Sequence, residues 1–209
     1  MTNKNGIKKI CVYSSSSKYL REKYYEISRE LGRIMVANGY DLVYGGGSTG
    51  TMIENAKAVK SAGGKVTGII PEKLRHLEVE NKDCDELIIT PEMRSRKEKL
   101  DVLSDATIAI SGGFGTLEEL SEMIVQKQLG YNDKAIVILN TDGFYDDLLK
   151  FFDRIMSENF ANEVARELYY VAKTPQEAVD YINTYVPVHA DVRQKWQKNS
   201  ENETVADKK

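Results

Sequence analysis

The sequence predicts a single α/β domain, in which a doubly wound parallel sheet is flanked by helices on both faces. Short apolar runs alternate about six or seven times with longer runs whose apolar residues recur at helical spacing. Glycine-rich turns follow two of the apolar runs, which is typical of strand-to-helix connections at the carboxyl ends of parallel strands. We therefore expect a ligand site at that edge of the sheet.

The expected strands are short and mostly apolar. They cover Lys9–Ser14, Tyr40–Tyr44, Lys65–Ile70, Glu86–Thr90, Thr107–Ile110, Ala135–Asn140 and, as a sheet edge, Leu168–Ala172. The expected helices cover Tyr19–Asn38, Thr51–Ala62, Met93–Asp105, Glu118–Leu129, Phe144–Glu158 and Pro175–Tyr185. Gly39 is a typical helix end and Thr174 a typical helix cap. The polar stretch Pro71–Asp85 lacks periodicity, so we expect a loop that covers a pocket.

These elements predict one Rossmann-like domain over residues 1–186, followed by a polar tail over residues 187–209. The chain has 209 residues and a net charge of −3, which argues against a broad basic surface for nucleic acid. No apolar run is long enough to cross a membrane, and the first residues lack the apolar core of a signal peptide. The two cysteines make no metal-binding pattern, and Cys11 reads as a buried thiol. We expect a cytoplasmic protein.

The most informative stretch runs from Ser111 to Glu119 and reads Ser-Gly-Gly-Phe-Gly-Thr-Leu-Glu-Glu. It connects an apolar strand to a helix, so its backbone N–H groups and the helix dipole would suit a phosphate. Thr116 and Glu119 have the spacing of a capping box, which would explain that pair without any function. Both interpretations are open on this stretch alone.

A second stretch, Met-Arg-Ser-Arg-Lys at Met93–Lys97, opens the preceding helix. Cations at a helix N-terminus are electrostatically unfavourable, so this crowding indicates a bound phosphate or a carboxylate partner. Arg96 stays protonated and therefore cannot act as a general base. It could hold a carboxylate such as Glu119 in its ionised form.

A third stretch, Tyr44–Met52, repeats the strand–glycine–helix arrangement. Its Gly45, Gly47 and Gly50 satisfy the dinucleotide pattern G-x-G-x-x-G, and Glu72 follows the next strand. We give this interpretation little weight because the motif follows the second strand rather than the first. A plain dinucleotide fold would also not require the second glycine turn after residue 111.

Together, the two glycine turns and the Arg-Lys pair resemble the Lonely Guy family. Its members are phosphoribohydrolases of nucleoside 5′-monophosphates, often mislabelled as lysine decarboxylases. The family pattern is P-G-G-x-G-T-x-x-E with an upstream Met-x-x-Arg-Lys, and this chain lacks only the proline, where it has Ser111. The resemblance runs from about Cys11 to Tyr145. Ser15, where members often have glycine, and Val125, where plant-like members tend to have threonine, are further departures.

The resemblance implies hydrolysis of the N-glycosidic bond of adenosine 5′-monophosphate or its N6-substituted forms, giving adenine or a cytokinin and ribose 5-phosphate. It places the catalytic roles on Arg96 and Glu119. The substrate-binding residues that we expect are Glu78, Lys97, Gly112, Gly113, Phe114, Gly115, Thr116, Gly46, Gly47 and Ser48. No cofactor or metal is implied. The expected partners are the nucleotide and a second copy of the chain, in a homodimer or larger homo-oligomer, with no nucleic acid and no membrane.

Several alternatives stay open at this stage. The serines at 14–17 suit a phosphate or ribose site but equally suit turn and cap chemistry. Glu78 lies in a polar loop and could simply be solvated. The whole pocket could belong to a nucleotide-binding module without catalysis, or, least favoured, to a dinucleotide-dependent oxidoreductase. At Ser111 we expect substitution by proline to leave activity intact, because the glycines still define the turn.

Overall fold

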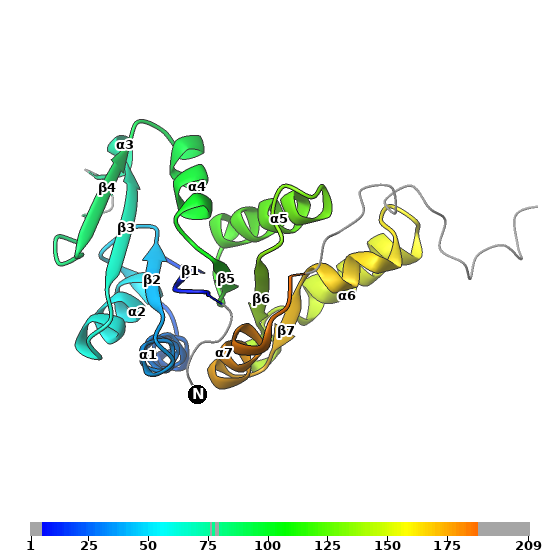
Figure 1. The fold of residues 1–209 in the computed structure, drawn as a ribbon, viewed down its shortest axis with the longest axis horizontal. Helices are drawn as coiled ribbons and strands as arrows, with labels where there is room; N and C mark the ends of the chain where they lie inside the picture. Colours follow the sequence, from blue (N-terminus) through cyan, green and yellow to red (C-terminus); the bar gives the residue numbers. More distant parts are fainter. Residues whose placement is uncertain (1–5, 76, 78–79, 188–209) are drawn as a thin grey trace, which may run out of the picture.

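The computed structural model describes residues 6–75, 77 and 80–187, which are built around a seven-stranded, fully parallel sheet (Figure 1). The strand order is β4-β3-β2-β1-β5-β6-β7, so the predicted doubly wound topology is confirmed. The strands are β1 (Lys9–Tyr13), β2 (Asp41–Tyr44), β3 (Val66–Pro71), β4 (Glu86–Thr90), β5 (Ala106–Ala109), β6 (Ala135–Leu139) and β7 (Tyr170–Ala172).

Helices form a layer on each face of the sheet (Figure 1). One layer holds α1 (Glu22–Ala37), α2 (Gly50–Ser61) and α7 (Pro175–Thr184). The other holds α4 (Met93–Val102), α5 (Phe114–Gln128) and α6 (Asp146–Ser157). Three short pieces complete the described chain, namely α3 (Glu72–Arg75) and the 3₁₀ helices η1 (Thr141–Gly143) and η2 (Glu163–Leu168).

The central strands are mostly apolar because both of their faces are covered. In β6 every residue is buried; Val137 packs with the α1 layer, and Ile136 and Ile138 pack with the α4–α6 layer. Cys11 of β1 is fully buried, which confirms its expected place in the core. Burial of these alternating side chains from water on two faces is the main stabilising term for the sheet.

Several boundaries differ from those expected. Helix α1 begins at Glu22 rather than Tyr19, because Arg21 has an extended backbone. Helix α4 ends at Val102, where the Ser104 hydroxyl donates to the carbonyl of Leu100 at 2.8 Å. Within the stretch expected to be a loop, residues 72–75 form the short helix α3. The 3₁₀ helix η2, much later in the chain, was not predicted either. In contrast, the Thr174 cap is confirmed, since its hydroxyl accepts a hydrogen bond from the Glu177 N–H at 3.2 Å.

The order in which successive strands are added to the sheet reverses between β1 and β5. Strand β1 pairs with β2 on one side and with β5 on the other, and the helices that follow β1 and β5 lie on opposite faces. The segments after these two strands therefore leave the sheet side by side without a helix above them. This switch point is where open α/β sheets bind their ligands.

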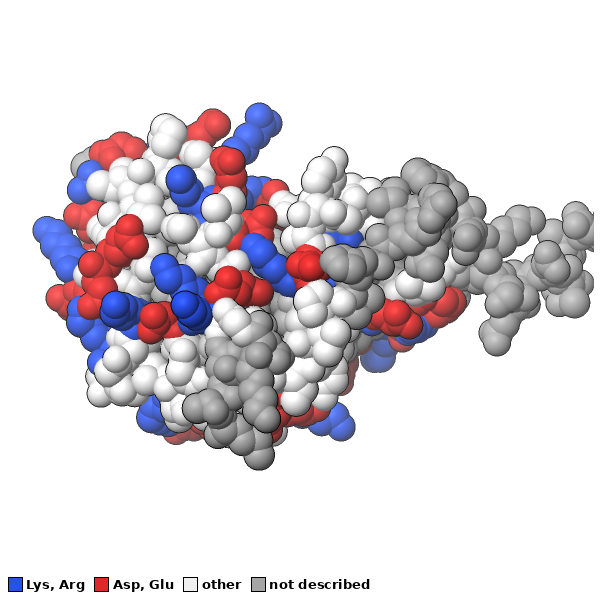
Figure 2. Space-filling view, viewed as in Figure 1, with Lys and Arg blue, Asp and Glu red and all other residues white. Residues whose placement is uncertain are grey.

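The surface carries no strong charge bias on the face drawn in Figure 2. Acidic and basic side chains are interleaved there, and neither sign forms a broad patch. No helix in the described part of the chain has the length and apolarity needed to cross a membrane.

Candidate active site

The N-terminus of α5 lies at the switch point, directly after β5. The first hydrogen bond of this helix runs from the Leu117 N–H to the Gly113 carbonyl at 3.1 Å, so the N–H groups of residues 114–116 have no acceptor within the helix. A side chain added at Gly113 would meet no atom within 4 Å, so open space lies beside these donors. This helix start combines free N–H groups with a positive dipole and is suited to an anion.

The Thr116 side chain joins α5 to β1 rather than capping α5. Its hydroxyl donates to the carbonyl of Ser14 at 3.1 Å and so ties α5 to the end of β1. A Cβ on residue 112 would come within 2.1 Å of that oxygen, which explains the glycine at this position. The cap position of α5 is Gly113, and Thr116 makes no cap hydrogen bond. The interpretation of Thr116 and Glu119 as a capping box is therefore wrong.

Glu119 instead pairs with Arg96 across two helices. Its Oε1 accepts a hydrogen bond from Arg96 Nη1 at 2.8 Å, and the two side chains are only 10% and 11% exposed. Arg96 Nε donates to the carbonyl of Ile69 at the end of β3, at 3.2 Å. A Cβ on Gly45 would lie 2.2 Å from Arg96 Nη2, so the guanidinium rests against the bare backbone after β2. The buried pair is thus held by β2, β3, α4 and α5.

The electrostatics of Glu119 reflect two opposing effects. Burial raises the pKa of this carboxyl above its usual value, because the ionised form loses hydration. The charge of Arg96 and its hydrogen bond lower the pKa in part. No donor among the described residues makes a hydrogen bond to Glu119 Oε2. One oxygen of the carboxylate is therefore fixed by Arg96, and the other is available to a ligand or a water molecule.

The glycine turn after β2 packs against Arg96 and against the segment that follows β1. Gly46 has a φ of +74° and Gly50 a φ of +66°, and a Cβ on Gly50 would clash with the Ser15 carbonyl oxygen, only 2.2 Å away. Thr49 donates its hydroxyl hydrogen to the Ser16 carbonyl at 2.9 Å. The turn is therefore packed against the segment that follows β1, and its close backbone contacts account for its glycines without a dinucleotide.

The other residues expected to contact the substrate lie at several places around the Arg96–Glu119 pair and the start of α5. Gly47 pairs with Glu80 in an isolated antiparallel bridge, and Ser48 is half-buried in the same turn. Lys97 Nζ is bound to Glu118 at 2.5 Å and to Glu122 at 2.8 Å, next to the Arg96 pair but on its outer side. Phe114 is 92% exposed at the start of α5. Two residues of the loop, His76 and Glu78, lie outside the described residues, as does the tail from residue 188.

A cavity of about 230 Å³ adjoins the anion site on the β6 side. Its polar wall comes from the segments after β1 and β5, and its apolar wall from Leu20, Tyr24 and Phe144. Tyr24 and Phe144 meet edge to face, with ring centroids 5.9 Å apart. The sequence reasoning missed this apolar wall, since the residues lie far apart in the chain and each reads as an ordinary helix position.

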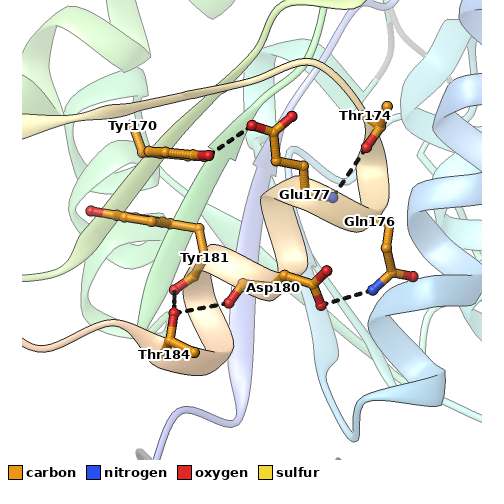
Figure 3. Close-up of a pocket in the computed structure, with 7 residues that line it drawn as sticks. All are labelled: Tyr170, Thr174, Gln176, Glu177, Asp180, Tyr181 and Thr184. Atoms are coloured by element: carbon orange, nitrogen blue, oxygen red, sulfur yellow. Dashed lines mark hydrogen bonds between the residues drawn. The ribbon is translucent and has the colours of Figure 1, made fainter.

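A larger hollow lies at the β7 edge, away from these groups (Figure 3). It has a volume of about 530 Å³, but its polar groups bind one another. Glu177 accepts from the Tyr170 hydroxyl at 2.7 Å, and Asp180 accepts from Gln176 at 2.9 Å. We therefore do not regard it as the ligand site. Within residues 6–75, 77 and 80–187, no group of three or more His, Cys, Asp or Glu side chains could hold a metal ion.

Comparisons with known proteins identify the family and the fold of this chain. Residues 52–182 match the family model described as "Possible lysine decarboxylase". A cytokinin riboside 5′-monophosphate phosphoribohydrolase of Oryza sativa subsp. japonica is 42% identical over 184 residues, 88% of this chain and 76% of its own length. One from Arabidopsis thaliana is 40% identical over 192 residues, 92% of this chain and 89% of its own.

Among solved structures, the molybdenum cofactor binding protein of Rippkaea orientalis has a TM-score of 0.65 at 23% identity, over 86% of this chain and 98% of its own. The molybdenum cofactor carrier protein of Chlamydomonas reinhardtii has a TM-score of 0.65 at 25% identity, over 84% and 96%. These likenesses support the Rossmann-like fold. The sequence relatives go further, and the chain belongs to the Lonely Guy family of phosphoribohydrolases, hydrolases that act on an N-glycosyl bond.

Proposed function

We propose that the protein hydrolyses the N-glycosidic bond of adenosine 5′-monophosphate or of an N6-substituted form, the cytokinin nucleotide that its relatives' names indicate. The products are the free base and ribose 5-phosphate. The observation that supports this most strongly is the buried Arg96–Glu119 pair, joined by a 2.8 Å hydrogen bond. Glu119 lies on α5, the helix whose first turn offers an anion site. Glu119 lies about one helical turn after residue 116, a spacing of about 5 Å.

The phosphate of the substrate is assigned to the start of α5. Its oxygens would accept hydrogen bonds from the N–H groups of residues 114–116, and the helix dipole adds attraction. Open space beside Gly113 leaves room for the group. Lys97 can contribute only a longer-range charge while its ammonium is bound to Glu118 and Glu122. Anchoring of the phosphate would direct the ribose along α5 toward Glu119.

The chemical step is then displacement at the anomeric carbon. A water oxygen bonds to C1′ as the bond to the base breaks, and the base leaves with the bonding electrons and takes up a proton. Glu119 would accept the proton of the water and stabilise the positive charge that develops on the ribose ring. Arg96 keeps the carboxylate ionised and oriented despite its burial.

A substrate panel with Glu119→Gln tests this proposal. The glutamine keeps the shape of the side chain but removes its charge, so we expect turnover of adenosine 5′-monophosphate and its N6-isopentenyl form to fall about a hundredfold or more. Nucleotide affinity should survive, as measured by titration calorimetry. In the wild-type protein, the acid limb of kcat should have its midpoint above the usual glutamate pKa of about 4.3, because burial raises the pKa of Glu119.

Two results would contradict the proposal. Wild-type turnover by Glu119→Gln would remove the carboxylate from the chemistry. Binding of adenosine 5′-monophosphate without release of base by the wild type would instead identify a nucleotide-binding module. Adenosine serves as the control substrate, because it lacks the phosphate and should be cleaved poorly.

A further inference from the structure

The hydroxyl of Ser111 is a buried polar group without a partner at the switch point. Ser111 follows β5 by two residues, is 92% buried, and lines the 230 Å³ cavity beside Gly112 and Gly113. Its Oγ has no hydrogen-bond partner among the described residues. A buried hydroxyl without a partner costs stability, typically about 1–3 kcal/mol, so its presence calls for a reason.

Three neighbouring hydroxyls, those of Thr116, Ser15 and Ser17, make hydrogen bonds within the protein. Thr116 gives its hydroxyl hydrogen to the Ser14 carbonyl, and a phosphate, which at neutral pH mainly accepts hydrogen bonds, cannot use it in this arrangement. Ser15 Oγ accepts from the Ser17 N–H at 3.1 Å, and Ser17 Oγ accepts from the Tyr19 N–H at 3.4 Å. Accepting these bonds leaves both serines free to donate, but neither side chain is buried. Ser14 Oγ also has no partner among the described residues, but Ser14 does not line the cavity. Ser111 is therefore the buried serine without a partner that lines the cavity.

The shape of the cavity limits what can reach this hydroxyl. At about 230 Å³ it is smaller than the roughly 300–1,000 Å³ of pockets that enclose a whole ligand, so it holds part of one. One wall is the glycine turn at the start of α5, and the opposite wall is apolar, with Tyr24 and Phe144. An apolar wall strengthens a hydrogen bond to a charged group, because the local dielectric is low.

We infer that Ser111 is a phosphate-binding residue, whose hydroxyl donates a hydrogen bond to the phosphoryl group held by the N–H groups at the start of α5. The inference rests on the proposed function for the identity of the ligand, and it adds a contact that the proline of the family pattern could not make. It also reverses the expectation from sequence that Ser111→Pro leaves substrate use unchanged.

The test uses Ser111→Ala with ribose 5-phosphate as the probe. We expect its dissociation constant, measured by titration calorimetry, to rise about tenfold or more, the usual scale for a hydrogen bond to a charged group. The KM for adenosine 5′-monophosphate should rise similarly with little change in kcat, while cleavage of adenosine, which has no phosphate, should not change. Ser111→Pro is a second variant without the hydroxyl, and Ser111→Thr should restore affinity.

Ser104→Ala is the matched control. Ser104 is also a buried serine, but its hydroxyl is bound to the Leu100 carbonyl at the end of α4. Its removal should lower the melting temperature and leave KM unchanged. Equal affinity of Ser111→Ala and wild type for ribose 5-phosphate, or no binding of this probe by the wild type, would overturn the inference. If the wild type cleaves no nucleotide but Ser111→Ala still loses affinity for the probe, the proposed reaction fails and the inference stands.

Discussion

Arg96 uses its planar guanidinium in three directions at once. It donates to the Glu119 carboxylate and to the Ile69 carbonyl, and its third nitrogen lies against Gly45. A lysine ammonium is a point charge on a flexible stem and cannot reproduce this fork. The residue type is therefore as specific as its charge.

For this reason Arg96→Lys should not restore what Arg96→Ala loses. We expect both variants to lower kcat by at least about tenfold, because a misplaced carboxylate stabilises the transition state less well. Steady-state kinetics on adenosine 5′-monophosphate measure the effect, and circular dichroism controls for folding. A lysine variant with wild-type kcat would show that charge alone is enough at this position.

Lys127 is a second buried charge, on the sheet-facing side of α5. It is 1% exposed, and its Nζ donates to the Lys134 carbonyl and to the Tyr185 hydroxyl, both at 2.8 Å. Burial lowers the pKa of this ammonium from 10.5 to about 8. Because the folded state favours the neutral amine, the cost of the charge is complete below pH 8 and disappears as the pH rises through 10.5.

Lys127→Met should remove this pH dependence. Between pH 7 and pH 10 we expect the unfolding free energy of the wild type to rise by about 2 kcal/mol relative to the variant. Parallel urea titrations of both proteins at several pH values measure the difference, and all other titrating groups cancel between them. A constant difference across this range would mean that the ammonium is not desolvated in the folded protein.

At the scale of elements, the site depends on how closely the chain after β2 approaches α4. Glycine at position 45 permits that approach, whereas glycine at position 32 permits α1 and α2 to pack. A Cβ on Gly32 would lie 2.9 Å from the Asn55 carbonyl oxygen and 3.0 Å from Ala58 Cβ. Both glycines thus permit a close contact, of which only one involves Arg96.

The pair Gly45→Ala and Gly32→Ala should separate activity from stability. We expect Gly45→Ala to lower kcat/KM by about ten- to a hundredfold through displacement of Arg96, with a small change in melting temperature. Gly32→Ala should destabilise the fold by about 1–3 kcal/mol through overpacking and leave kcat/KM unchanged. Calorimetry measures the stability of both variants, and steady-state kinetics measure their kcat/KM. Lost activity in Gly32→Ala with unchanged activity in Gly45→Ala would refute the contact assigned to Gly45 and Arg96.

The sequence was sufficient to predict the strands, the layers and the helix that carries Glu119, because apolar periodicity and glycine turns determine them locally. It did not predict the start of α5, where Phe114 and Gly115 of the glycine turn are already helical. The sequence also did not predict the hydrogen bond of Arg96 to the Ile69 carbonyl. That contact depends on the relative positions of β3 and α4 in three dimensions, and a backbone acceptor leaves no sequence signal. For Thr116, a local cap was expected, but the Ser14 carbonyl across the switch point competed successfully.

At the scale of the whole molecule, apolar side chains remain exposed on α5, on α6 and in the loops after them. Val125 of α5 and Phe151 of α6 are 48% and 56% exposed, and Tyr131 and Phe160, in the loops after these helices, are more exposed still. In α6 only Met156 is buried, although the helix also carries other large apolar residues. Exposed apolar side chains on neighbouring helices are typical of a subunit contact.

We therefore expect sedimentation equilibrium to give a homodimer or a larger homo-oligomer at micromolar concentration. Val125→Asp and Phe151→Asp should weaken the association, because a buried unpaired charge is costly at an interface. Val186→Asp, which changes an exposed apolar residue after α7 in the opposite layer, is the control and should have no effect. A wild-type monomer throughout the concentration range would refute the expectation.

The contacts of Arg96 also bear on how the protein reaches its native state. One side chain joins the turn after β2, the end of β3 and helix α5. In sequence, α2 separates the turn after β2 from the end of β3, and α3, β4, α4 and β5 separate the end of β3 from α5. The ion pair is complete only when the sheet has formed on both sides of the switch point. During refolding, the site therefore forms only when the slowest of these three segments has docked.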